Sequence, residues 1–161
     1  MDEFVYKSIG VIRSSFKKPE GMPIQPSGAA GVAGIVEVDP EYELGLKDLD
    51  GFSHIILIYH FHKSEGFSLR VVPFLDNEQR GIFATRAPRR PNTIGLSIVR
   101  LKKVRGNILE IENVDVLDQT PLLDIKPFVP DFDVYKNVKT GWLAKASKSA
   151  DQKKSDKRFI S

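Results

Sequence analysis

Residues 96–113 read Leu-Ser-Ile-Val-Arg-Leu-Lys-Lys-Val-Arg-Gly-Asn-Ile-Leu-Glu-Ile-Glu-Asn, with apolar and polar residues in near alternation on both sides of a short break. A period of two is typical of β-strands that bury one face. The break, residues 103–107, contains Gly106 and Asn107, which suit a tight turn. The stretch therefore predicts a β-hairpin.

Similar β-rich runs recur along the chain, bounded by Gly, Pro, Asn or Asp. Strands are predicted within residues 4–13, 31–38, 53–62, 69–73, 81–84, 96–104, 108–113 and 122–125. One short helix is predicted from Pro40 to Leu49, with Asp39 as its N-cap. Many short strands, one short helix and no βαβ alternation predict a mostly β protein, a barrel or a sandwich.

The composition favours one domain followed by a basic tail. The chain has 161 residues, 41% of them hydrophobic, which is enough for one core. Residues 145–161 carry six basic and two acidic residues, a net charge of +4, so the remaining 144 residues sum to −1 of the total +3. We predict a barrel domain over residues 1–144 and a basic, flexible tail over residues 145–161.

Several protein classes are disfavoured by the same data. The chain has no cysteine, which excludes disulfides and thiolate metal sites. The start of the chain is acidic where a signal peptide is basic, and the apolar runs are too short to span a bilayer. These features predict a soluble cytoplasmic protein without a membrane partner.

Residues 81–97 form a loop dense in charge and proline. Arg86 and Arg90 are fixed cations whose planar groups suit carboxylate or phosphate, and Pro88 and Pro91 stiffen the backbone around them. From residue 81 to residue 109 there are seven Arg or Lys and no Asp or Glu. The pattern predicts a preformed anion-binding loop.

Two other motifs are weaker. Gly28, Gly31 and Gly34 resemble a dinucleotide fingerprint, but a strand-like run follows where a helix is needed, so close backbone approach in a barrel is the better interpretation. His54 and His60 share parity with His62, and two such imidazoles could bind one metal ion. A mononuclear site needs further ligands, so we expect no metal and leave a histidine-based metal hydrolase as a minor alternative.

Two aspartates are candidates for chemistry. Asp118 begins Asp-Gln-Thr-Pro, which by itself is a good turn. Asp124 lies between Leu123 and Ile125, where a charge is costly unless it is paired or functional. From spacing alone, a salt bridge to Lys126 or a nearby arginine and a catalytic role are equally supported for Asp124.

Residues 81–97 closely resemble the TsaA-like family of tRNA-modifying methyltransferases. Residues 49–56, Phe61-His62 and residues 118–127 resemble its other blocks in the same order, over a range of about 9–130. The resemblance implies a single small β-barrel that binds S-adenosylmethionine, usually as a homodimer. It also implies methylation of the exocyclic nitrogen of a threonylcarbamoyl-adenosine beside the anticodon of tRNA. A non-catalytic RNA-binding barrel is the alternative from another class.

The resemblance also implies roles for individual residues. The cofactor contacts of the family fall on Pro23, Ile24, Gln25, His62, Lys63, Arg86, Leu96, Asp118, Gln119, Thr120 and Pro121. The chain departs from the family pattern at Ile24, where arginine is common, at Thr93, where proline is common, and at Gln119, where glycine is common. The last departure predicts a differently shaped turn.

A mechanism follows from these assignments as a hypothesis. An adenine nitrogen that carries a threonylcarbamoyl group has a more acidic N–H, which a carboxylate can accept. Asp124 is the first candidate for this base and Asp118 the second. Arg90, Asn92 and Lys126 are the candidates for binding the substrate RNA.

Overall fold

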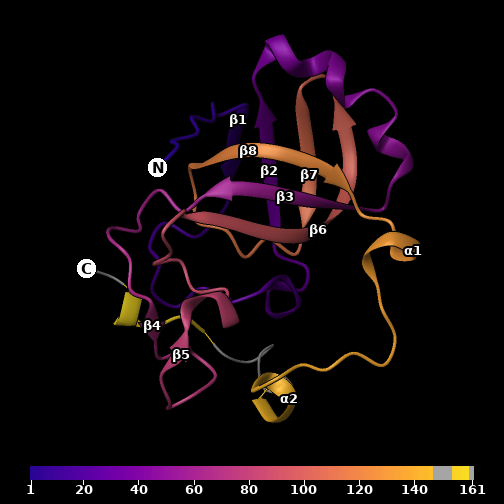
Figure 1. Cartoon of the computed structure of the whole chain (residues 1–161). Coiled ribbons are helices and arrows are strands. Elements are labelled where there is room, and N and C mark those ends of the chain that lie inside the picture. Colours follow the sequence, from indigo (N-terminus) through magenta and orange to yellow (C-terminus); the bar gives the residue numbers. More distant parts are fainter. Residues whose placement is uncertain (147–153, 160–161) are drawn as a thin grey trace.

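The six longest strands close into one antiparallel barrel (Figure 1). The computed structural model describes residues 1–146 and 154–159. Around the barrel the strands follow the order β1, β2, β7, β6, β3 and β8, and each neighbouring pair is antiparallel. Their bounds are β1 Gly10–Arg13, β2 Ala33–Val38, β7 Ile108–Glu112, β6 Ile94–Arg105, β3 His54–His60 and β8 Thr120–Pro127. The prediction of a mostly β barrel is confirmed.

The predicted hairpin joins β6 and β7. Arg105 lies opposite Ile108, so Gly106 and Asn107 form a two-residue turn, and Gly106 has a φ of 57°. The left-handed backbone at this position explains the glycine. The alternation from residue 96 to 113 thus specified this pair of strands correctly.

The interior of the barrel is filled by alternate residues of the strands. On β3, the buried positions are Ile55, Leu57 and Tyr59, while the residues between them are partly exposed. The core also includes Val99 and Leu122, each with no exposed surface. Full burial of one such aliphatic side chain stabilises the fold by roughly 1.5–3 kcal/mol.

The predicted helix exists in a tighter form. It is a 3₁₀ helix, η2 (Pro40–Leu46), and a second one, η3 (Leu49–Gly51), follows it. Asp39 occupies the predicted N-cap position, but its side chain makes no capping hydrogen bond. Its backbone carbonyl instead accepts a hydrogen bond from the Tyr42 amide at 2.9 Å, which closes a three-residue turn.

Two predicted strands are shorter or different. Strand begins only at Gly10, and residues 1–9 have no regular secondary structure. Residues 70–71 and 80–81 form a small separate ladder, β4 (Arg70–Val71) with β5 (Arg80–Gly81). Residues 82–84, predicted as strand, are the 3₁₀ helix η4 (Ile82–Ala84) instead, since buried Ile82 packs with Val71 in a small second cluster.

The remaining helical elements are single turns. They are η1 (Pro26–Ala29), α1 (Pro130–Asp133), α2 (Leu143–Ala146) and η6 (Lys157–Phe159). Within the described residues, no helix has both the length and the apolarity needed to cross a membrane.

Part of the predicted flexible tail is described. Residues 147–153 and 160–161 lie outside the described residues, whereas residues 154–159 run beside the loops below the barrel (Figure 1). Ser155 exchanges backbone hydrogen bonds with Gly21 and Met22 at 2.9 and 2.8 Å. The Phe159 ring meets the edge of Phe74 at a centroid distance of 5.1 Å. This segment thus joins the loop that follows β1 to the loop that follows β4.

Candidate functional site

A cavity of about 790 Å³ opens at one end of the barrel. Strand β3 ends there and strands β6 and β8 begin there. Loops complete its wall, and the lining comes from residues within 19–26, 59–64, 73–75, 83–90, 94–96, 115–120, 142–143 and 155–159. The size falls in the range of roughly 300–1,000 Å³ that is usual for sites of small ligands.

Tyr59, which lines this cavity, belongs to a buried pair of hydroxyl groups. Tyr59 faces Gly95 across the β3–β6 ladder, and Ser97 follows on the same face of β6. The Tyr59 hydroxyl lies 2.9 Å from Ser97 Oγ, and the two residues are only 5% and 1% exposed. The position of the tyrosine hydroxyl is therefore fixed by the sheet.

Asp115 extends this pair into a chain of three polar groups. Ser97 Oγ donates a hydrogen bond of 2.6 Å to Asp115 Oδ1. Val114 and Val116, on either side, are buried in the core and hold the aspartate in the cavity wall. Burial raises the pKa of Asp115 to about 6, although the Ser97 hydrogen bond and the charge of Arg86 act in the opposite direction.

Arg86 and Arg90 both line the cavity, but their surroundings differ. Arg90 Nη1 donates to the carbonyl oxygens of Ile82, Thr85 and Ala87 at 2.8–3.3 Å, so this arginine holds its own loop together. Arg86 makes no hydrogen bond or ion pair in the part of the chain that the structure describes. Its cationic group is thus available to an anion in the cavity.

His62 and Thr120 lie close together in the cavity wall. Thr120 Oγ1 lies 3.4 Å from His62 Nδ1 and donates to the Leu117 carbonyl at 2.6 Å. Burial, with the positive charge of Lys63, lowers the pKa of His62. The imidazole is therefore neutral at neutral pH and adds no charge to the cavity.

Comparison with known proteins identifies the family. Residues 11–134 match the family model described as the tRNA-methyltransferase O N-terminal domain, TrmO_N. The chain belongs to the TrmO family. The expected relation to TsaA-like, TrmO-type proteins is confirmed.

Relatives in the TrmO family include archaeal and mammalian proteins. A probable S-adenosyl-L-methionine-binding protein of Pyrococcus abyssi is 55% identical over 97% of this chain and 85% of its own length. The mouse tRNA (adenine(37)-N6)-methyltransferase is 35% identical over 81% of this chain. The crystal structure of TrmO from Pseudomonas aeruginosa superposes with a TM-score of 0.74 at 35% identity over 88% of this chain.

The matched proteins differ in length. The match covers 32% of the mouse protein and 63% of the Pseudomonas aeruginosa chain. An S-adenosyl-L-methionine-binding protein of Archaeoglobus fulgidus is instead covered over 92% of its length, at 40% identity. The chain thus corresponds to the part that short and long TrmO relatives share.

The structure brings together most residues that the TrmO resemblance assigns to the cofactor. Eight of the eleven line the large cavity, namely Pro23, Ile24, Gln25, His62, Lys63, Arg86, Leu96 and Thr120. Asp118 and Gln119 line a smaller hollow beside Arg13 and Lys17 instead. Pro121 lines neither of these two cavities.

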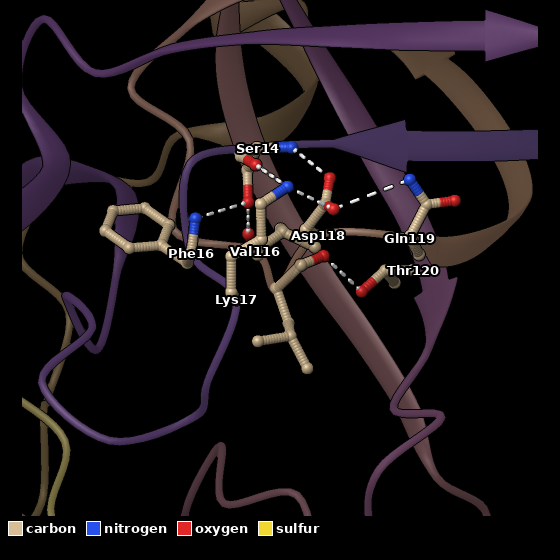
Figure 2. Close-up of polar contacts among 8 residues, drawn as sticks. Ser14, Phe16, Lys17, Val116, Asp118, Gln119 and Thr120 are labelled. Carbon is tan, nitrogen blue, oxygen red and sulfur yellow. Dashed lines mark hydrogen bonds and ion pairs between the residues drawn. The ribbon is translucent and has the colours of Figure 1, made fainter.

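Asp118 joins two segments far apart in the sequence, as Figure 2 shows. Its Oδ1 accepts a hydrogen bond from the Ser14 amide at 3.0 Å, and its other oxygen pairs with Lys17 Nζ. The Lys17 hydrogen bond is the main reason that the pKa of Asp118 lies below its usual range. Gln119 beside it has a φ of 64°, the left-handed region that favours glycine. Gln119 thus adopts a backbone conformation that glycine adopts more readily.

The other predicted chemical residues lie away from the large cavity. Asp124 is paired with Lys126 Nζ at 2.9 Å, and both side chains are about half exposed, at 44% and 59%. The salt-bridge interpretation of Asp124 thus describes its contacts. Asn92 is exposed and does not line the cavity either.

The three histidines have separate partners. His54 bonds Ser53 at 2.9 Å and packs against Phe128, while His60 lies 3.0 Å from Thr93 Oγ1. Only His62 of the three lines the cavity. Over the described ranges, no group of three or more His, Asp or Glu side chains is arranged to hold a metal ion.

Sequence reasoning missed Asp115, Ser97 and Tyr59. Asp115 lies between two valines, which is the same signal that singled out Asp124. A buried carboxylate between apolar neighbours was therefore detectable, but its hydroxyl partners on other strands were not.

The glycine cluster was interpreted correctly at Gly34, where an added Cβ would lie 2.6 Å from Val114.

Proposed function

We propose that this chain is an S-adenosylmethionine-dependent methyltransferase that acts on the exocyclic nitrogen of adenosine 37, next to the anticodon of tRNA. The names of the mouse protein and of the archaeal relatives support the reaction and the cofactor. The observation that carries the proposal is the cavity, since eight of the family-assigned contacts, Arg86 among them, line it. The finer substrate, an adenosine that already carries threonylcarbamoyl, belongs to the same proposal.

The cavity suits S-adenosylmethionine in shape and charge. Its volume of about 790 Å³ accommodates a ligand of this size, and Phe61 and Phe74 supply aromatic wall for an adenine ring. Arg86, which has no ion pair among the described residues, would hold the carboxylate of the methionine end. Pro23, Ile24 and Gln25 would hold the ligand from the loop that follows β1.

When bound, S-adenosylmethionine supplies an activated methyl group. Such a transfer needs alignment and exclusion of water more than covalent help from the protein. The apolar wall formed by Leu96 and Phe83 would exclude water, and neutral His62 adds no competing positive charge. Lys63 at the same wall would bind a carboxylate of the modified base, because Arg90 and Lys126 are already held by protein groups.

Binding of tRNA, a homodimer and a cytoplasmic location complete the proposal. Phe83, Ile94 and Leu96 line the cavity yet are 75%, 44% and 46% exposed in the single chain. Large apolar side chains grouped in this way are typical of surfaces that a ligand or a second subunit covers. This grouping supports a dimer that covers the mouth of the cavity.

Calorimetry and nucleoside analysis test the proposal. The pure protein should bind S-adenosylmethionine with one site per chain. It should then add one methyl group to tRNA, found by mass spectrometry of the anticodon-loop nucleosides. tRNA from cells that lack threonylcarbamoyl modification should be methylated far less if that group is part of the substrate. Absence of cofactor binding, or binding without methylation of any tRNA, would refute the methyltransferase.

A further inference from the structure

Asp115 differs from the other carboxylate in the cavity wall. Within the described residues, Asp115 and Asp156 are the two carboxylates that line the cavity. Asp156 pairs with Arg158 at 2.8 Å, whereas no ion pair of Asp115 is found in the described part of the chain. The direct side-chain partner of Asp115 is the neutral Ser97 hydroxyl.

The hydrogen bonds that link Tyr59, Ser97 and Asp115 are all donated in the direction of Asp115. Ser97 has a single hydroxyl hydrogen, which it donates to Asp115, so its oxygen accepts the hydrogen of Tyr59. Burial raises the pKa of Tyr59, which therefore keeps its proton. The Ser97 hydrogen bond to the Asp115 carboxylate, supported from behind by the Tyr59 hydroxyl, favours the charged form of Asp115 without neutralising it.

The electrostatic surroundings of Asp115 suit a proton acceptor. The other ionisable side chains of the cavity wall are Tyr59, His62, Lys63, Arg86, Arg90 and Asp156. Burial raises the pKa of Asp115, and Arg86 lowers it, with a result of about 6. A base is most effective when its pKa lies near the pH at which it works.

We propose that Asp115 is the catalytic base of the methyl transfer, with Ser97 and Tyr59 as positioning residues. This inference rests on the proposed function. The nitrogen gives its proton to the Asp115 carboxylate and keeps the N–H electron pair as it bonds to the methyl carbon. The S–C bond breaks with its electron pair left on sulfur. One sulfonium charge disappears and one carboxylate is neutralised, so the net charge of the cavity is unchanged.

Asp124 and Asp118, the two aspartates predicted from the sequence, are the alternative candidates for the catalytic base. Asp124 is paired with Lys126 outside the cavity, and Asp118 is bound to Ser14 and Lys17 beside the smaller hollow. Neither lines the space in which cofactor and base would meet. Asp115 meets this geometric condition.

Single-turnover methylation of tRNA by Asp115→Asn, Asp124→Asn and the wild-type protein separates these candidates, with exposed Asp131→Asn as the control. Asp115→Asn should lower the rate at least 100-fold. Its dissociation constant for S-adenosylmethionine, from calorimetry, should stay within threefold of wild type. A fall of less than tenfold overturns the inference, as does cofactor binding weakened more than tenfold. A comparable loss in Asp124→Asn alone also overturns it.

The pH profile tests the positioning residues. The wild-type rate should rise with pH to a plateau, with a midpoint near the Asp115 pKa of about 6. Ser97→Ala and Tyr59→Phe should move that midpoint upward, and Ser97→Thr should restore it, because a hydroxyl donor stabilises the carboxylate. An unmoved midpoint in Ser97→Ala refutes the positioning role. No methylation by wild type refutes the proposed function and this inference together, whereas normal methylation by Asp115→Asn refutes the inference alone.

Discussion

Gly95 lies directly opposite Tyr59 in the β3–β6 ladder, and its missing side chain makes room for the tyrosine ring. A Cβ built on Gly95 would lie 2.2 Å from Tyr59 Cε2 and 2.6 Å from Cζ. Gly95 in strand β6 therefore determines where the tyrosine ring can lie. In this position the Tyr59 hydroxyl reaches Ser97, which in turn donates a hydrogen bond to Asp115.

Gly95→Ala should destabilise the protein by about 1–3 kcal/mol, because the ring must move in a packed core. Urea unfolding at neutral pH measures the loss. Gly45→Ala is the matched control, since Gly45 has no atom within 4 Å of an added Cβ and no positive φ. Equal stability of the two variants would contradict the steric role of Gly95.

Gln119→Gly should stabilise the protein by about 0.5–1 kcal/mol. Gln119 has a φ of 64°, and a side chain in this left-handed region costs energy that glycine avoids. Thermal unfolding of the variant beside Gln79→Gly measures the effect. Gln79 is exposed and has no positive φ, so its replacement should stabilise nothing. A lower melting temperature for Gln119→Gly would show that its side-chain contact with Asp118 outweighs the strain.

Local patterns predicted the fold well where strands pair with near neighbours. Residues 96–113 contain both strands and the turn of their hairpin, so alternation and Gly106 were sufficient. The helix at Pro40 and its N-cap residue were predicted in place, but the 3₁₀ form and the lack of a side-chain bond from Asp39 depend on hydrogen bonding that composition does not specify. Residue propensity predicts a helical segment at this place, while packing determines whether the segment forms a 3₁₀ helix or an α-helix.

The site and the basic strand that follows it were predicted less well, because the partners of their polar and charged residues lie on other strands. Arg100, Lys102 and Arg105 seemed unopposed in sequence, yet Glu110 and Glu112 on β7 pair with them at 2.8–3.6 Å. Ser97 is likewise 18 residues from Asp115 along the chain, and Tyr59 is 38 residues from Ser97. Such contacts follow from strand register, which a single sequence does not display.

Asp118→Asn should cost about 1 kcal/mol of stability at pH 7, because Ser14 and Lys17 would lose a charged acceptor. The folded pKa of Asp118 is lowered. The stability that it contributes is therefore present above the ordinary value of 3.8 and is lost as pH falls through the folded pKa. Urea unfolding at pH 7 and pH 3 should show a larger difference between variant and wild type at the higher pH. A difference of the same size at pH 3 would exclude the ionised carboxylate as its source.

Arg86→Gln and Arg90→Gln should affect different properties, cofactor binding in the first and stability in the second. Loss of Arg86 should weaken S-adenosylmethionine binding about 10–100-fold, the value of a charge-assisted hydrogen bond, and should lower stability less than the loss of Arg90, because Arg86 acts on Asp115 through its charge alone. Loss of Arg90 removes three bonds to carbonyl oxygens and should lower stability by about 1–3 kcal/mol. Calorimetry and urea unfolding of both variants check the contrast. If Arg86→Gln binds the cofactor as wild type does, the proposed carboxylate contact is refuted.

Asp115→Asn should make the folded protein more stable at pH 8, whatever it does to catalysis. The folded pKa of about 6 exceeds the ordinary value of 3.8, so the folded state binds more protons than the unfolded state between these values. Wild-type stability attributable to Asp115 therefore falls as pH rises from about 4 to 6 and stays low above that range. A difference of about two units between the folded and the ordinary pKa corresponds to at most about 3 kcal/mol of stability.

The variant replaces the carboxylate by an amide of the same shape that still accepts the Ser97 hydrogen bond. Its advantage over wild type should be near zero at pH 3.5 and largest at pH 8, and urea unfolding at both values measures it. The same variant would then be more stable and less active, the combination expected when a charge is kept in a cavity for chemistry. An advantage that does not depend on pH would show that the pKa of Asp115 is the same in the folded and unfolded states, and so that burial does not raise it.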